Sequence, residues 1–259
     1  MAQYIEVEEA IGMSGLRVVL TPGVPGPWSE SAKGILYVKK LPYTRVKQII
    51  AAPNEALRKW TAQETAPVFV YNDERPRSLW IDQLYLAERL APTPALIPDD
   101  IDDRMRMFGM ANELCGENGF GWARRLMILD DTLNTPNLPD QGKQFANFMG
   151  NKYGYGKEVS AAAPARVGAI VAAFAKQLDA QRKRGSKFLI GDRLSALDIY
   201  WACFAALLKP LPDDLCKITP AFRKMYECEH PAVTKAATPA LFEHRDFIYH
   251  EYLQLPVDL

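Results

Sequence analysis

The chain has 259 residues, in which 31 lysine and arginine residues balance 31 aspartate and glutamate residues, and 48% of the residues are apolar. This is the composition of an ordinary water-soluble globular protein, and the length suggests between one and two domains. A net charge of zero removes the broad attraction on which non-specific binders of nucleic acids and anionic membranes depend. We therefore expect a small-molecule or protein partner, and neither a nucleic acid nor a membrane.

Three further features narrow the class of protein. The longest uninterrupted apolar run, residues 199–208, is half as long as a bilayer-spanning helix requires. The acidic start of the chain lacks the basic leader and the hydrophobic core of a secretion signal, so we expect a cytoplasmic protein. The cysteines form no C-x-x-C pair and are expected to be buried free thiols: they are Cys115, Cys203, Cys216 and Cys228.

Strand and helix patterns alternate over the first 90 residues. Residues 16–20 predict a short strand, and a turn-rich loop follows them. A helix is expected to begin at Pro27, because proline is pre-organised for the first helical position. The apolar residues that repeat on one face of this helix are Trp28, Ala32, Ile35 and Leu36.

The next elements complete a mixed α/β pattern. A second strand near residues 43–48 would pair parallel to the first in a right-handed strand–helix–strand unit. The elements expected after it are a helix over 54–60, a proline-led strand over 66–71, a turn over 72–76, a strand over 78–80 that pairs back, and a closing helix over 81–90.

The composition changes at residues 91–98, where three prolines fall within seven residues. This segment is the expected boundary between a first domain, residues 1–91, and an all-helical domain, residues 99–259. In the second domain, residues 102–115 predict a helix, whereas residues 132–155 are rich in proline, asparagine and glycine and are expected to be irregular. A stripe at helical spacing is formed by Val167, Ile170, Val171, Phe174 and Leu178.

Ser195 and Asp198 have the spacing of a capping box at the start of an almost wholly apolar helix. The serine side chain caps the helix, and the aspartate three residues later reaches back to the serine backbone. We interpret this motif as one that serves folding rather than catalysis.

The order of these elements resembles that of the cytosolic glutathione S-transferase superfamily, in particular its bacterial-type members. Residues 26–43 resemble the first helix and the following strand of that family, Thr65-Ala-Pro-Val68 resembles its Val-Pro element, and Leu79–Gln83 stands where the family usually has a Glu-Ser pair. The resemblance covers nearly the whole chain apart from residues 1–14 and 132–155. It implies an α/β N-terminal thioredoxin-like domain followed by an all-α C-terminal helical domain, a homodimer, and glutathione as co-substrate.

The resemblance also implies a glutathione site beside Thr65, Ala66 and Pro67. The proline of the family's Val-Pro element is cis, and a cis Pro67 would turn the Ala66 backbone outward to pair with the cysteine of glutathione like an added strand. The alternative is a trans proline that simply begins an edge strand.

Asp82 and Gln83 are expected to begin a helix, where free backbone N–H groups and the helix dipole favour a carboxylate. By analogy with the family, Asp82 would meet the α-amino group of glutathione and Gln83 would donate to its α-carboxylate. The alternative role for Asp82 is a helix cap.

Catalysis in this family means forming the glutathione thiolate. A thiol titrates near pH 8.5, so lowering its pKa by two units requires about 2.7 kcal/mol of preference for the anion. Gly26 stands where many members carry the activating serine or cysteine, and it has no side-chain donor. Ser29 is the nearest hydroxyl and our candidate catalytic residue, beside the free backbone N–H groups of Trp28 and Ser29, although it could be only a capping or surface serine. The alternative hydrogen-bond donors to the thiolate are the Thr21 hydroxyl and the Trp28 indole N–H.

An electrophile pocket is expected between the domains. Its candidate residues are Met107, Met110, Trp122 and Trp201, for each of which core packing is the alternative. His230, His244 and His250 match no zinc spacing, so we expect no metal.

Two functions remain open. The first is a glutathione transferase that activates the glutathione thiol for attack on an apolar electrophile, by conjugation or by glutathione-dependent bond cleavage. The second is a non-catalytic glutathione-binding or protein-interaction module on the same fold, because Gly26 and the Asp82-Gln83 pair depart from the family pattern.

Overall fold

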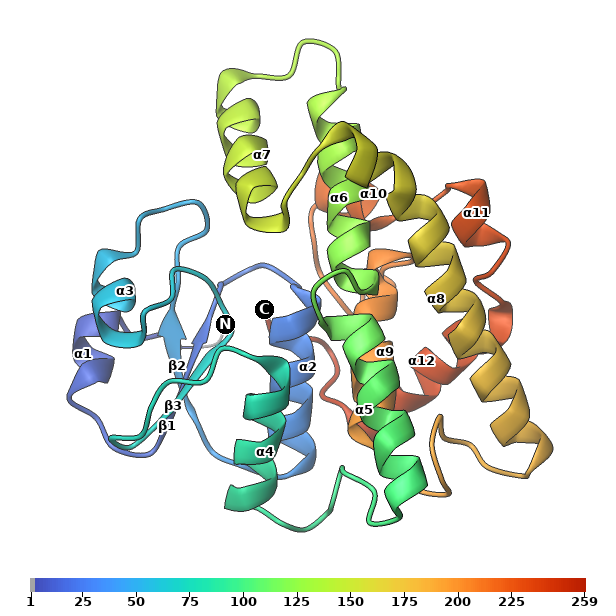
Figure 1. Ribbon diagram of the computed structural model, residues 1–259. Helices are drawn as coiled ribbons and strands as arrows, with labels where there is room; N and C mark the ends of the chain where they lie inside the picture. Colours follow the sequence, from blue (N-terminus) through green and yellow to red (C-terminus); the bar gives the residue numbers. More distant parts are fainter. Residues whose placement is uncertain (1–2) are drawn as a thin grey trace.

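The computed structural model describes residues 3–259 (Figure 1). Residues 1–2, the start of the expected first domain, lie outside the described residues. The elements in chain order are α1 (Val7–Ile11), β1 (Leu16–Leu20), α2 (Pro27–Val38), β2 (Thr44–Lys47), α3 (Glu55–Thr61), β3 (Val68–Tyr71), α4 (Trp80–Leu90), α5 (Ile101–Cys115), α6 (Phe120–Leu133), α7 (Asp140–Tyr153), α8 (Lys157–Lys183), α9 (Ala196–Phe204), the 3-10 helix η1 (Ala205–Leu207), α10 (Pro220–Tyr226), α11 (Pro231–Thr234) and α12 (Pro239–Tyr252).

The first part of the chain is a three-stranded sheet with helices on both faces (Figure 1). The strand order is β2-β1-β3, with β1 parallel to β2 and antiparallel to β3. Helices α1 and α3 lie on one face, and α2 and α4 lie between the other face and the helical bundle. All five residues of β1 are buried, as befits a central strand covered on both sides. The expected parallel strand–helix–strand unit is confirmed.

The strand expected at residues 78–80 is wrong. Pairing on that side of β3 is a single antiparallel bridge between Phe69 and Arg77, after which α4 begins at Trp80. The Trp80 ring packs edge-on against Tyr200 at 5.5 Å between ring centroids. The chain thus leaves the sheet after one bridge, and the first residue of α4 packs on the helical bundle.

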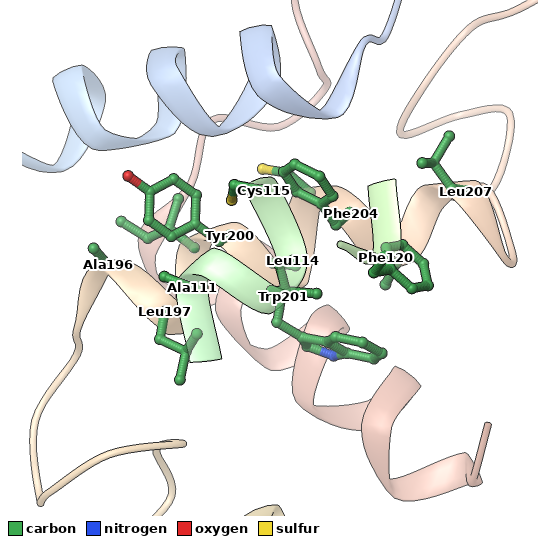
Figure 2. Close-up of a cluster of buried hydrophobic side chains, with 14 of the residues drawn as sticks. Ala111, Leu114, Cys115, Phe120, Ala196, Leu197, Tyr200, Trp201, Phe204 and Leu207 are labelled. Carbon is green, nitrogen blue, oxygen red and sulfur yellow. The ribbon is translucent and has the colours of Figure 1, made fainter. Parts of the chain in front are cut away.

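Helix α9 lies at the centre of the helical part, and all nine of its residues are buried. Figure 2 shows Tyr200, Trp201 and Phe204 of this helix among side chains of α5 and α6. The capping box between Ser195 and Asp198 is present at its start, so that prediction is confirmed. The predicted apolar stripe of α8 is also confirmed, since each of its five residues is buried.

The expectation that residues 132–155 are irregular is wrong. Helix α6 continues to Leu133, and α7 occupies most of the rest of this segment. Tyr153 at the end of α7 is buried, its ring lies 4.7 Å from that of Trp122, and its carbonyl accepts a hydrogen bond from the Trp122 indole at 3.0 Å. Packing of this kind outweighs the low helix propensity of asparagine and glycine.

Helix α8 is long and apolar enough, by length and composition, to cross a membrane. In this fold its buried stripe instead faces the protein, where α8 packs against α6, α11 and α12. The helix therefore has the packing of a core helix in a globular bundle.

Two helical glycines give a matched prediction about stability. A Cβ at Gly168 in α8 would lie 2.4 Å from the backbone oxygen of Ala232, whereas a Cβ at Gly109 in α5 would meet no atom within 4 Å. We expect Gly168→Ala to lower the free energy of unfolding by about 1–3 kcal/mol through overpacking. We expect Gly109→Ala to raise it by up to about 1 kcal/mol through helix propensity. Urea unfolding of both variants measures these changes, and a neutral Gly168→Ala would contradict the close approach of α8 to α11.

Candidate functional site

A small cavity of about 80 Å³ lies where the first part of the chain meets α6 and α7. Gly26, Trp28 and Ser29 from the start of α2 line it, together with Thr65 and Ala66 from the segment before β3. The structure thus brings together four of the predicted site residues, namely Trp28, Ser29, Thr65 and Ala66. The rest of the lining comes from the loops after β1 and β2 and from α6 and α7.

The start of α2 lies at this cavity and carries free backbone donors. Gly26 precedes the helix, and Pro27 is its first residue. The N–H groups of Trp28 and Ser29 lie in the first turn, where an α-helix offers them no carbonyl partner. A Cβ built on Gly26 would lie 4.0 Å from the Ser29 hydroxyl oxygen. The Ser29 hydroxyl therefore lies close to the position where a side chain at residue 26 would point.

The segment before β3 presents its main chain to the same cavity. The ladder between β1 and β3 runs from Val68 to Tyr71, so Ala66 lies outside it. The Ala66–Pro67 peptide bond is cis. The position of Ala66, beside the cavity and beyond the paired part of β3, leaves room for an extended peptide to pair with its backbone.

The two alternative donors, the Trp28 indole N–H and the Thr21 hydroxyl, already form hydrogen bonds within the protein. The Trp28 indole N–H donates to the Cys115 carbonyl at 2.9 Å. The Thr21 hydroxyl donates to the side-chain oxygen of Gln48. We therefore set aside both residues as donors to a thiol, although both side chains line the cavity.

Asp82 and Gln83 lie in the first turn of α4 and do not line the cavity. Asp82 forms an ion pair with the exposed Arg75 at 3.4 Å. Gln83 is buried, and its amide nitrogen donates to the carbonyls of Pro67 at 3.0 Å and Arg77 at 3.1 Å. Both hydrogens of that amide are thus used within the protein. The predicted donation from Gln83 to glutathione is corrected: the side chain instead links Pro67, just before β3, to Arg77, which pairs back with Phe69.

The predicted electrophile residues are placed elsewhere. Met107 and Trp201 are fully buried in the core, and Met110 packs against the same core. Trp122 supports Tyr153 from behind rather than lining the cavity. The apolar wall is formed instead by Phe148, Met149 and Tyr153, which the sequence reasoning missed because it expected an irregular segment there.

The cavity is cationic. Arg125 of α6 and Lys152 of α7 line it, and no aspartate or glutamate does so among the described residues. The pKa of Lys152 is lowered to about 8, because its ammonium group is partly desolvated and lies near Arg125. The sequence reasoning missed both cations, and the Arg124-Arg125 pair within an otherwise apolar helix was the available signal.

None of the four cysteines lines the cavity, so none offers an alternative nucleophile there. Cys115, Cys203 and Cys216 are buried free thiols, and Cys228 is half-buried. Burial raises the pKa of Cys216 to about 11 and also raises the pKa values of Cys115 and Cys203, so these three thiols stay protonated at neutral pH. Across residues 3–259, no three His, Cys, Asp or Glu side chains are grouped so that they could hold a metal ion.

No protein-family model and no curated protein matches this sequence. Solved structures do match it over most of its length. A Tau class glutathione S-transferase from mango, Mangifera indica, is 20% identical with a TM-score of 0.53, and the match covers 91% of this chain and 98% of that one. A glutathione S-transferase from Xanthobacter autotrophicus is 14% identical with a TM-score of 0.59, covering 94% and 98%.

A third similar structure is a glutathione S-transferase from Methylobacterium radiotolerans, solved in complex with glutathione sulfonate. It is 15% identical with a TM-score of 0.55, and the match covers 89% of this chain and 94% of that one. At these identities the likeness concerns the arrangement of the chain, which here is a small mixed sheet with flanking helices followed by a helical bundle. The chain therefore has the fold of the glutathione S-transferases, a thioredoxin-like domain followed by an all-helical domain.

Proposed function

We propose that this protein is a glutathione-dependent transferase whose active site is the cavity between α2, the segment before β3, and α6 and α7. One observation carries the proposal: Ser29 and the start of α2, where the first-turn N–H groups have no helical partner, line the same cavity as Ala66. Glutathione would lie extended along the Ala66 main chain, with its thiol at the start of α2. The neighbour solved with glutathione sulfonate supports this choice of ligand.

The groups at the start of α2 suffice for thiolate formation. A helix N-terminus stabilises an adjacent anion by about 0.3–1 kcal/mol, and by as much as about 2 kcal/mol when partly buried. A hydrogen bond to a charged group adds about 1.5–3 kcal/mol. Together they reach the roughly 2.7 kcal/mol that a two-unit fall in the thiol pKa requires. The thiolate sulfur then bonds to the electrophilic carbon, the leaving group departs with the bonding electron pair, and the thiol proton passes to solvent.

The first turn of α4 is our candidate for the amino-acid head of glutathione. Its free backbone N–H groups would bind the α-carboxylate. The Asp82 carboxylate would bind the α-amino group and give up its ion pair with the exposed Arg75. Gln83 acts through Pro67 and Arg77, whose carbonyls it holds, and is a positioning residue.

Removal of the Ser29 hydroxyl tests the catalytic role. We expect Ser29→Ala to lower kcat/KM for conjugation of glutathione to a reactive aromatic halide by about 10- to 100-fold, because one hydrogen bond to the thiolate is lost. The pKa of bound glutathione, followed by the ultraviolet absorbance of its thiolate, should rise in the same variant. Ser31→Ala is the matched control, since the Ser31 hydroxyl is on the same helix but donates to the Trp28 carbonyl at 3.1 Å.

Two results would contradict this assignment. If turnover is unchanged in Ser29→Ala, the protein is still an enzyme but Ser29 is not its catalytic residue. Retention on immobilised glutathione with no turnover in the wild type would favour the second function, a non-catalytic binding module, which the lack of a side chain at Gly26 motivates.

The homodimer implied by the family resemblance has a candidate surface. Four large apolar side chains at α4 and α5 are 43–62% exposed, and such clusters mark interaction surfaces. They are Leu79, Tyr85, Ile101 and Met105. We propose that a second copy of the chain covers them. The cytoplasmic location stays a prediction from the sequence.

A further inference from the structure

The wall of the cavity opposite α2 carries two cations with no acidic counterpart. Arg125 and Lys152 both line it, on α6 and α7 respectively, and none of the described residues that line the cavity is an aspartate or glutamate. Arg125 is half-buried and Lys152 is exposed. A half-buried cation in a protein is ordinarily paired. Two positive charges at a cavity with no acidic lining residue therefore favour an anionic ligand.

The hydrogen bonds of Arg125 also favour an anionic ligand. Its Nη2 atom donates to the Tyr226 hydroxyl at 2.9 Å, and its guanidinium lies 5.2 Å from the centre of the Tyr226 ring. Its Nε atom is buried and has no hydrogen-bond partner among the described residues. A buried donor without an acceptor is rare in native proteins and calls for an explanation.

The adjacent Arg124 provides a contrast. Its Nε and Nη2 atoms donate to backbone carbonyls of Leu207, Met225, Tyr226 and Glu227. That side chain holds α6 to two distant segments and lines a different cavity, between α6 and α10. Each arginine has one buried nitrogen without a partner among the described residues, Nη1 of Arg124 and Nε of Arg125, but only Arg125 lines the cavity that Ser29 also lines.

The surroundings of the two cations indicate the rest of the ligand. Phe148, Met149 and Tyr153 line the same wall, which gives an apolar and aromatic surface next to the positive charge. An aromatic ring with an anionic substituent matches both features, since arginine binds a carboxylate through parallel hydrogen bonds and aromatic side chains pack against a ring.

We propose that the electrophilic co-substrate is an aromatic carboxylate, whose carboxylate pairs with Arg125 and Lys152 while its ring packs against α7. This inference rests on the proposed function and narrows its substrate class from apolar electrophiles to anionic ones. Arg125 and Lys152 are then the residues that determine specificity.

A pair of matched probes tests the inference. 4-Chloro-3-nitrobenzoate carries the carboxylate, and its methyl ester is neutral but otherwise alike. With either probe, the glutathione sulfur bonds to the ring carbon that bears chlorine, chloride leaves with the bonding electron pair, and the thiol proton passes to solvent. Each kcat/KM is divided by the rate constant of the same probe with free glutathione, which removes the difference in intrinsic reactivity.

The wild-type enzyme should favour the carboxylate probe by about tenfold or more on this normalised scale. Arg125→Met and Lys152→Met should each reduce the normalised ratio of carboxylate to ester about tenfold, and Arg125→Lys should restore part of it. Lys143→Met is the matched control, because Lys143 is an exposed cation on α7 that pairs with Asp140 and does not line the cavity. Thermal unfolding of each variant shows whether it is folded.

The outcomes separate this inference from the proposed function. Turnover of the ester with no preference for the carboxylate in the wild type would overturn the inference and leave the transferase. Equal losses on both probes in Arg125→Met would also overturn it, because the arginine would then act on glutathione. Turnover of neither probe would overturn the transferase, and titration calorimetry with the two glutathione conjugates would still decide whether Arg125 and Lys152 select the carboxylate.

Discussion

Asp198→Ala is expected to lower the free energy of unfolding by about 3–5 kcal/mol, the cost of breaking a buried network that contains a charge. Asp198 is fully buried. One of its carboxylate oxygens accepts from the backbone N–H and the hydroxyl of Ser195, both at 2.9 Å. The other accepts from the Leu189 N–H at 2.8 Å and lies 3.0 Å from the His244 Nε2 atom. The substitution leaves these groups buried without partners.

Urea unfolding measures this loss as a fall in the transition midpoint at constant slope. Asp192→Ala is the matched control, since Asp192 is exposed in the loop just before α9, and its removal should change the free energy of unfolding by less than about 0.5 kcal/mol. Equal midpoints for the two variants would show that the carboxylate of Asp198 does not hold the start of α9.

Arg124→Met is expected to destabilise the protein by about 2–4 kcal/mol, because buried carbonyls lose their donor. Arg124 is 2% exposed, and its Nε atom donates to Leu207 at 2.9 Å while Nη2 donates to Glu227 at 2.9 Å. Methionine fills similar space but donates no hydrogen bond. The carbonyls that follow α9 and α10 would therefore lie unsatisfied against α6.

Chemical denaturation followed by tryptophan fluorescence measures this effect. Arg166→Met is the comparison, since Arg166 also bonds a distant carbonyl, that of Asn118 at 3.1 Å, but at the surface. Its loss should cost at most about 1 kcal/mol, the range of exposed polar interactions. An Arg124→Met variant as stable as Arg166→Met would contradict the tying role of the buried guanidinium.

Local signals in the sequence located most elements of the first part of the fold, but not α1, and they wrongly predicted a strand over residues 78–80. The helix that begins at Pro27 and the strand over residues 16–20 are found at those residues, because proline position and apolar runs act over one or two turns. The capping box at Ser195 is equally local. The order of such elements resembles a known family, and the fold expected from that resemblance is confirmed.

The candidate site was only half predictable, because its second wall depends on tertiary packing. Ser29 and Ala66 follow from the elements that bear them. Phe148 and Lys152 reach the cavity only because α7 forms, and α7 forms because Tyr153 packs against Trp122. The composition of that segment favours turns, so no pattern in the sequence predicts the helix.

Gln83 illustrates the same limit at a single residue. Its position in the chain suggested a ligand donor, but its amide reaches the carbonyl of Pro67, sixteen residues earlier in the chain. Hydrogen bonds between segments this far apart are set by the fold. A motif alone therefore cannot distinguish a residue that binds the ligand from a residue that holds the ligand-binding segment in place.

The volume of the cavity bears on how tightly any tripeptide is held. At about 80 Å³ it is well below the roughly 300–1,000 Å³ of ordinary ligand pockets. A tripeptide bound as proposed therefore lies mostly outside this volume, along Ala66 and toward the first turn of α4. Much of its surface then stays in contact with water, so its dissociation constant depends on a few main-chain and charged contacts more than on enclosure.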